Sequence, residues 1–95
     1  MGNKRFLLVA RIRTTEYAAL QAVLTQLIPQ GTITATEDGL RAEGEMEGTS
    51  ARDLNRTLLS AMRRIDRRAT LRAEWTADGM TERFFDYTAR GSYSR

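Results

Sequence analysis

The stretch Phe6-Leu7-Leu8-Val9-Ala10-Arg11-Ile12 (residues 6–12) decides the fold of this chain. Its side chains alternate between the two sides of an extended backbone, which is the period of a β-strand. One side carries only apolar groups, namely Phe6, Leu8, Ala10 and Ile12, and the other side carries Leu7, Val9 and Arg11. Because the first half of the stretch is apolar on both sides, we expect this strand to lie in the interior of a sheet.

A helical pattern follows this strand and ends before residue 31. Apolar side chains recur here at spacings of three and four residues, as on one face of a helix: Tyr17, Leu20, Val23, Leu24, Leu27 and Ile28. Thr14 or Thr15 can cap the start of the helix, and Glu16 would lie in its first turn, where the helix dipole favours an acid. Pro29 and Gly31 predict its end.

A β-hairpin is predicted next, with strands at residues 32–36 and 40–47. They flank Glu37-Asp38-Gly39, which is a turn signal because Asp tolerates and Gly prefers a positive φ. One face of the second strand carries Leu40, Ala42, Gly44 and Met46, and the other carries Arg41, Glu43, Glu45 and Glu47. We expect the charged face to meet solvent or a partner.

The second helix is predicted to begin at Ser50, where Asp53 three residues later resembles a capping box. Its apolar stripe consists of Leu54, Leu58, Ala61, Met62 and Ile65. We place its end near Arg68, because an alternating pattern begins at Thr70. In the core we expect Leu54, Leu58, Met62 and Ile65 to pack against Phe6, Leu8, Leu71 and Trp75.

A second hairpin is predicted from residues 70–76 and 81–88, joined by Asp78-Gly79. Both hairpins carry the sequence Thr-x-Asp-Gly, at residues 36–39 and 76–79. Two interpretations fit this repeat: a unit of helix plus hairpin has been duplicated, or Asp-Gly recurs because it suits hairpin turns. Residues 1–4 and 90–95 are expected to be flexible termini.

The predicted order of elements is βαββαββ, an α+β fold, and residues 1–95 are expected to form a single domain. The first six elements resemble the two-layer ferredoxin-like βαββαβ sandwich, in which two helices cover one face of an antiparallel sheet. Right-handed crossovers would place the first and third strands in the centre of that sheet. The fifth strand would then be an extra C-terminal β-strand beside the fourth.

The composition excludes several classes of function. The chain has no cysteine and no histidine, which removes disulfides, Cys-ligated metals, thiol catalysis and the commonest general base. Two sets of carboxylates could in principle bind a cation, Glu43 with Glu45 and Glu47, and Glu74 with Glu82 and Asp86, but cross-strand pairing with arginine is the simpler account. We therefore predict no catalytic residue, no cofactor and no metal site, and rank an enzymatic role last.

We expect no targeting segment in this sequence. No apolar run approaches the roughly 20 residues that a membrane helix needs. The apolar stretch behind the charged N-terminus is too short for a signal peptide. We expect a cytoplasmic protein that does not bind membranes.

Fourteen of the fifteen basic residues are arginine, and they are unevenly distributed. Residues 51–72 hold seven arginines and two aspartates, a net charge of +5, whereas residues 36–50 hold five acids and one arginine, a net charge of −4. Arg52, Arg56, Arg63 and Arg67 recur along one stripe of the second helix. This stripe is a candidate contact for the phosphates of nucleic acid, RNA in particular; the alternative is a solvated helix face.

Apolar residues outside the predicted core give the leading functional hypothesis. Phe84 and Phe85 are adjacent, so a strand must point them to opposite faces, and one of them must lie outside a one-sided core. Together with Leu7 and Val9 it would form an exposed apolar patch, which monomers rarely show. The alternative is that the C-terminal tail with Tyr93 covers the aromatic side chain. We therefore predict a non-enzymatic binding or assembly module, a homodimer that self-associates through the open face of its sheet or through its last strand.

Overall fold

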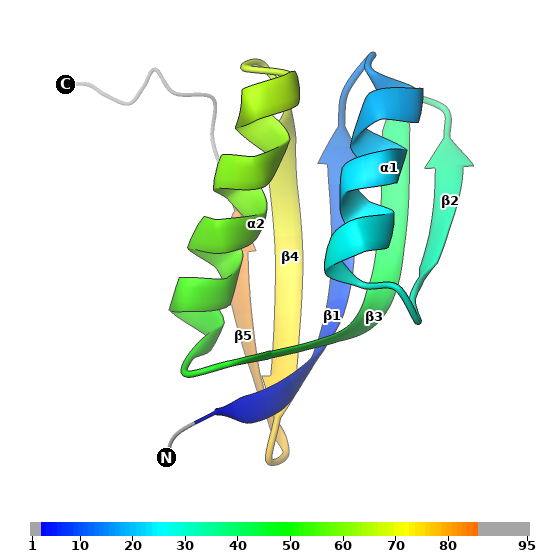
Figure 1. Ribbon diagram of the computed structural model, residues 1–95. Coiled ribbons are helices and arrows are strands. Elements are labelled where there is room, and N and C mark those ends of the chain that lie inside the picture. The colour runs from blue at the N-terminus through cyan, green and yellow to red at the C-terminus, as the bar shows by residue number, and fades with distance from the viewer. Residues whose placement is uncertain (1–2, 86–95) are drawn as a thin grey trace, which may run out of the picture.

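The computed structural model describes residues 3–85 and contains five strands and two helices in the predicted order. Figure 1 shows the arrangement of these elements. Their bounds are β1 Lys4–Arg13, α1 Tyr17–Leu27, β2 Thr32–Thr36, β3 Gly39–Gly48, α2 Ala51–Ile65, β4 Thr70–Ala77 and β5 Met80–Phe85. Lys4, predicted to belong to a flexible terminus, is instead the first residue of β1 and pairs with Gly48. The predictions for residues 86–95 lie outside the described residues.

The five strands form one antiparallel sheet in the order β2-β3-β1-β4-β5. β1 pairs with β3 on one side and with β4 on the other, so the first and third strands are central, as predicted. β5 lies at the edge beside β4, which is also the predicted place. The apolar sequence of β1 suits this interior position. A strand with neighbours on both sides is more buried than an edge strand, and it exposes no backbone edge.

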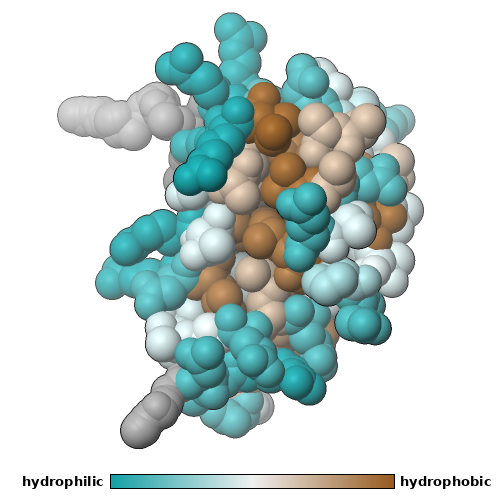
Figure 2. Space-filling model, viewed as in Figure 1, coloured by the Kyte–Doolittle hydropathy of each residue, from teal (hydrophilic) through white to brown (hydrophobic). Residues whose placement is uncertain are grey.

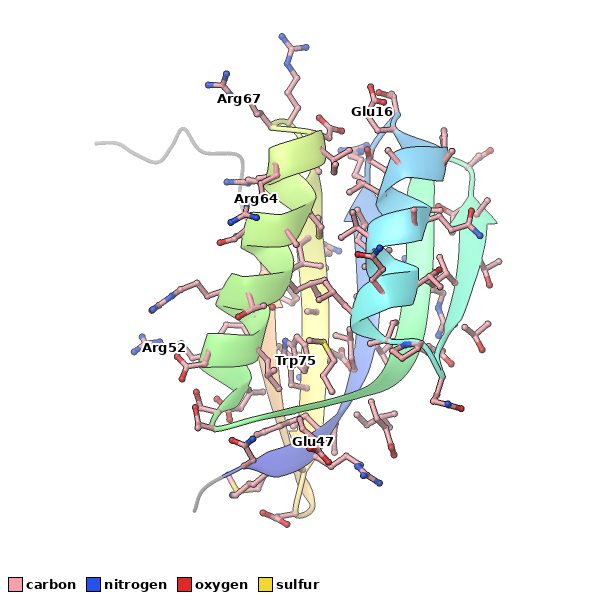
Figure 3. All side chains as sticks on the ribbon, in the orientation of Figure 1. Glu16, Glu47, Arg52, Arg64, Arg67 and Trp75 are labelled. Carbon is pink, nitrogen blue, oxygen red and sulfur yellow. The ribbon has the colours of Figure 1, made fainter. Side chains whose placement is uncertain are left out.

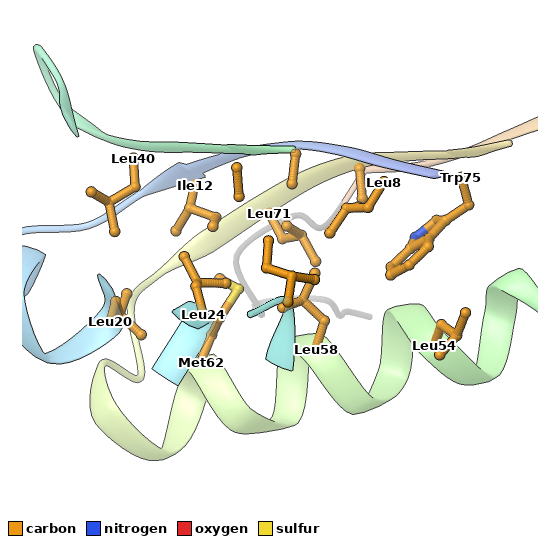
Figure 4. Close-up of a cluster of buried hydrophobic side chains, with 14 of the residues drawn as sticks. Leu8, Ile12, Leu20, Leu24, Leu40, Leu54, Leu58, Met62, Leu71 and Trp75 are labelled. Carbon is orange, nitrogen blue, oxygen red and sulfur yellow. The ribbon is translucent and has the colours of Figure 1, made fainter. Parts of the chain in front are cut away.

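Both helices cover the same face of the sheet, and the core lies between these two layers (Figures 1 and 4). The alternating side chains of β1 point into this core, where Leu8 and Ala10 have no exposed surface. α2 contributes Leu54, Leu58 and Met62, and α1 contributes Leu20 and Leu24. Trp75 from β4 is fully buried, and its indole N–H donates a hydrogen bond to Asn55 Oδ1 of α2 at 3.0 Å. That bond matters because an unpaired buried donor costs about 1–3 kcal/mol.

Two large residues assigned to the apolar stripes are exposed. Ile65 is 41 % exposed and Tyr17 is 37 % exposed, so the prediction that Ile65 packs in the core is wrong. Each stands at an end of its helix, Tyr17 at the first residue of α1 and Ile65 at the last residue of α2. Both positions lie where a helix meets a connecting segment, and Ala69, in the turn after α2, is buried.

The ends of the helices also differ from the predicted caps. α2 ends at Ile65 rather than near Arg68, because Asp66 takes an extended backbone conformation and its side chain accepts a hydrogen bond from the backbone N–H of Arg68. α1 begins without a side-chain cap on Glu16; the Thr14 hydroxyl accepts the Glu16 N–H at 2.9 Å just before the helix. The predicted cap of α2 is confirmed, since Ser50 Oγ accepts the Asp53 N–H at 3.1 Å.

Thr14 and Asp66 join the two crossover connections. The buried Thr14 hydroxyl donates a hydrogen bond of 2.6 Å to Asp66 Oδ2, which ties the residues before α1 to the residue after α2. This bond and the backbone N–H of Arg68 lower the pKa of the Asp66 carboxyl, because both stabilise its ionised form. The two helices are thereby connected at one end of the sheet.

The shared Thr-x-Asp-Gly sequence forms two different turns. In the second hairpin Asp78 and Gly79 are the two loop residues, both with positive φ (55° and 77°). In the first hairpin the loop residues are Glu37 and Asp38, and Gly39 already pairs with Thr36. Gly39 is required for another reason, since a Cβ there would lie 1.7 Å from the Ile12 carbonyl oxygen. The repeat is thus offset by one residue, which argues against a duplicated unit.

Truncation of Leu58 tests the assignment of the core. Leu58 has no exposed surface, so we expect Leu58→Ala to lower the free energy of unfolding by about 2–5 kcal/mol. Ile65→Ala is the matched control on the same helix, with an expected cost of about 1 kcal/mol or less. Urea unfolding followed by circular dichroism measures both, and equal effects would contradict the assigned burial.

The Thr14–Asp66 bond predicts a specific pH dependence. The lowered pKa of Asp66 contributes stability that is present above its unfolded value of about 4 and is lost as the pH falls through the folded value. We expect Asp66→Asn to be less stable than the wild type at neutral pH and to approach it in acid. Urea unfolding across this pH range tests the prediction, with Asp78→Asn as control, since Asp78 forms an exposed ion pair with Lys4. A constant difference between wild type and Asp66→Asn would contradict it.

Candidate functional site

The sheet face opposite the helices is the candidate site. Among residues 3–85 no helix or strand packs over it, and it carries apolar side chains at Leu7 and Phe85, each 47 % exposed, with the half-buried Val9 between the charged residues. Phe84 points the other way and packs against the core. Of the two phenylalanines proposed for an interface, the open face therefore presents Phe85.

The register of the strands arranges the charges of this face in rows that run across the sheet. Arg11 of β1 pairs with Arg41 of β3 and with Arg72 of β4, and these three residues are named the arginine row. Two residues away along the strand, Val9 pairs with Glu43 and Glu74, and these three are named the glutamate row. Neighbouring strands are about 4.8 Å apart, so the three arginines start from adjacent backbone positions on the open face.

The arginine row is incompletely neutralised. Arg41 pairs with Glu43, and the guanidinium of Arg72 lies 5.3 Å from the centre of the Phe85 ring. Neither Arg11 nor Arg72 has an acidic partner within residues 3–85. Like charges directly opposite each other on neighbouring strands are destabilising. Repulsion among these three arginines therefore opposes their side-by-side placement on the open face.

The opposite end of the face is acidic. Glu74 of the glutamate row pairs with Arg83 of β5 at 3.1 Å. Beyond it Arg5 bridges Glu45 and Glu47 of β3, at 3.7 Å and 3.2 Å. All these pairs are exposed, so each one is worth little by itself. Along the strands the open face therefore changes from basic at the arginine row to acidic at the glutamate row and at Glu45 and Glu47 beyond it.

Of the four arginines proposed for nucleic-acid contact, three lie on α2 but differ in exposure, and the fourth lies beyond the end of the helix. Arg52 and Arg56 are exposed on α2, whereas Arg63 is half-buried and its Nε donates to the Ala69 carbonyl oxygen at 3.4 Å. Arg67 lies beyond the end of α2, in the turn before β4. Arg52, Arg64 and Arg67 extend away from the core on this side of the molecule (Figure 3). In Figure 2, hydrophilic side chains gather at the α2 edge, and a hydrophobic band runs down the middle of the helix side.

Within residues 3–85 no group of three or more acidic residues is arranged to hold a metal ion. None of the helices there is long and apolar enough to cross a membrane.

Comparison with known proteins adds no further assignment. No protein-family model matches the chain, and no significant match was found among curated proteins or among solved structures.

The arginine row was not anticipated from the sequence. Arg11, Arg41 and Arg72 stand on three separate segments, and only the register of β1 with β3 and β4 makes them neighbours. The one signal in the sequence was that all three fall on the solvent side of their alternating strands. Knowing that they lie in the same row requires the pairing itself.

Proposed function

We propose that this protein is a non-enzymatic binding and assembly module that self-associates through the open face of its sheet. The observation that carries the proposal is the exposure of Leu7 and Phe85, each 47 % exposed, on a face that no described element covers. Apolar groups in such a position favour association because their removal from water stabilises the complex. The β5 edge is a second route to self-association, since β5 has a strand neighbour on one side only among residues 3–85.

The fold is also proposed to be a ferredoxin-like sandwich with one added edge strand. The order β2-β3-β1-β4 of the first four strands supports this classification, and so does the position of both helices on one face. Fold class alone does not carry a function, so the proposal of self-association rests on the side chains of the open face.

Sedimentation equilibrium tests self-association directly. We expect the wild type to be a homodimer at micromolar concentration, and Leu7→Thr combined with Phe85→Thr to weaken the dimer by about tenfold or more, because each apolar group is buried twice. Tyr17→Gln combined with Ile65→Gln is the matched control, since these exposed apolar residues lie on the helix side. A wild type that stays monomeric at all accessible concentrations would overturn the proposal.

A second candidate function is nucleic-acid binding through the α2 side, favoured by the exposure of Arg52, Arg56 and Arg67. Removing one phosphate contact lowers the slope of log affinity against log salt by about 0.9 for duplex DNA. Changing these three residues to Gln should therefore flatten the salt dependence if the surface binds nucleic acid. The control changes Arg5 and Arg83 to Gln, because both lie on the opposite face.

We rank this function second and expect no appreciable binding of RNA or DNA by the wild type at physiological salt. The two arms of the experiment are filter binding and a salt titration with single-stranded and duplex oligonucleotides. Tight wild-type binding that the triple substitution abolishes would reverse the ranking.

A further inference from the structure

We infer that two copies pack open face to open face about a two-fold axis that crosses the strands between Val9 and Arg11. This inference rests on the proposed self-association and specifies its geometry. It is carried by the alternation of the arginine row and the glutamate row along the central strands. The occupant of the open face is then a second copy of this chain.

Symmetry limits the ways in which the two faces can meet. In a face-to-face dimer the two-fold axis must lie in the plane between the sheets, and the same patch is used by both copies. An axis parallel to the strands keeps each row opposite itself. An axis perpendicular to the strands reverses the order of the rows, so an axis midway between two rows brings each row against a different row of the partner.

The charges select the perpendicular axis. With the parallel axis through β1, Arg72 would face the partner's Arg41, and Glu74 would face the partner's Glu43, so like charges would be brought together. With the perpendicular axis between the rows, Arg72 faces the partner's Glu74, and Arg41 faces the partner's Glu43. Juxtaposed like charges strongly disfavour an interface, which decides between the two arrangements.

The perpendicular axis also brings acidic side chains of the partner close to Arg11. Arg11, which has no acidic partner within residues 3–85, comes to lie over the partner's Val9, between two carboxylates of the partner's glutamate row. Phe85 faces the partner's Arg83, an arrangement that allows a cation–π contact. Leu7 faces the partner's Arg13, whose aliphatic stem can cover it.

The packing angle of twisted sheets is compatible with this arrangement. Sheets that pack face to face cross at about 30°, so the rows match best near the axis and diverge toward the edges. The decisive contacts are therefore those of the central strands β1, β3 and β4. Charges at the far acidic end, such as Arg5 and Glu47, fall outside the matched rows.

A charge-exchange experiment tests the axis. R72E places two acids against each other in a homodimer, and E74R places two arginines against each other, so each variant alone should self-associate at least about tenfold more weakly than the wild type. An equimolar mixture of R72E and E74R should form a heterodimer, because every contact between residues 72 and 74 is then of opposite charge. The double variant R72E/E74R should recover the homodimer.

R5E and E47R are the control pair. These residues form an exposed ion pair on the same face, at 3.2 Å, but lie away from the proposed axis. Neither variant should change the dimerisation constant by more than about twofold, because an exposed ion pair away from the axis contributes little free energy. Circular dichroism and urea unfolding of every variant establish that the fold is retained, as expected for exposed positions.

The outcomes separate this inference from the proposed function. A monomeric wild type overturns both. A dimer that R72E and E74R leave unchanged overturns the axis alone, and would indicate pairing through the β5 edge. A dimer that either variant strengthens would show the parallel axis, in which the acid introduced by R72E would meet the partner's Arg41. Copurification of the wild type with nucleic acid, abolished by R72E, would show that the arginine row binds phosphate instead of a second copy.

Discussion

The structure depends on one constraint, the antiparallel pairing of β1 with both β3 and β4 while one side of β1 is fully buried. The side chains of a strand alternate with a period of two, so a slip of one residue would turn Leu8 and Ala10 out of the core. The register is therefore fixed by burial on the helix side. The same register also determines which residues are neighbours on the open face. Packing on the helix side therefore places Arg11 between Arg41 and Arg72.

Polar contacts complete this arrangement at the ends and in the middle of the helix layer. Asn55 satisfies the buried indole of Trp75, which positions α2 over β4. Thr14 and Asp66 link the start of α1 to the end of α2. Both bonds join elements that the hydrophobic stripes alone would allow to slide. The apolar core supplies most of the stability, and these two hydrogen bonds fix the positions of the helices relative to the sheet and to each other.

The two faces of the molecule use charge differently. On the helix side, the arginines of α2 and the following turn are spread along an exposed edge, and Arg63 is already engaged with the Ala69 carbonyl oxygen. On the open side, the charges are sorted into rows next to exposed apolar groups. A surface that combines apolar area with ordered charges of both signs suits a partner with a matching order of charges. In the dimer that we propose, a second copy provides this order through symmetry.

The sequence by itself determined the elements of this protein, because the signals for them are local: the alternation in residues 6–12, the Ser50 cap, and the Asp78-Gly79 turn. It also determined that Phe84 and Phe85 face opposite ways, since neighbours in a strand must. The ends of the helices and the exposure of Ile65 were decided only by tertiary structure, through the Asp66 contacts that end α2. Tertiary structure also decided that the same Thr-x-Asp-Gly sequence forms two different turns. In the first hairpin the Ile12 carbonyl oxygen leaves no room for a Cβ at Gly39, which lies in the strand and not in the loop. The arginine row belongs with these, because side-chain alternation is a property of one strand, whereas register is a property of three strands packed together.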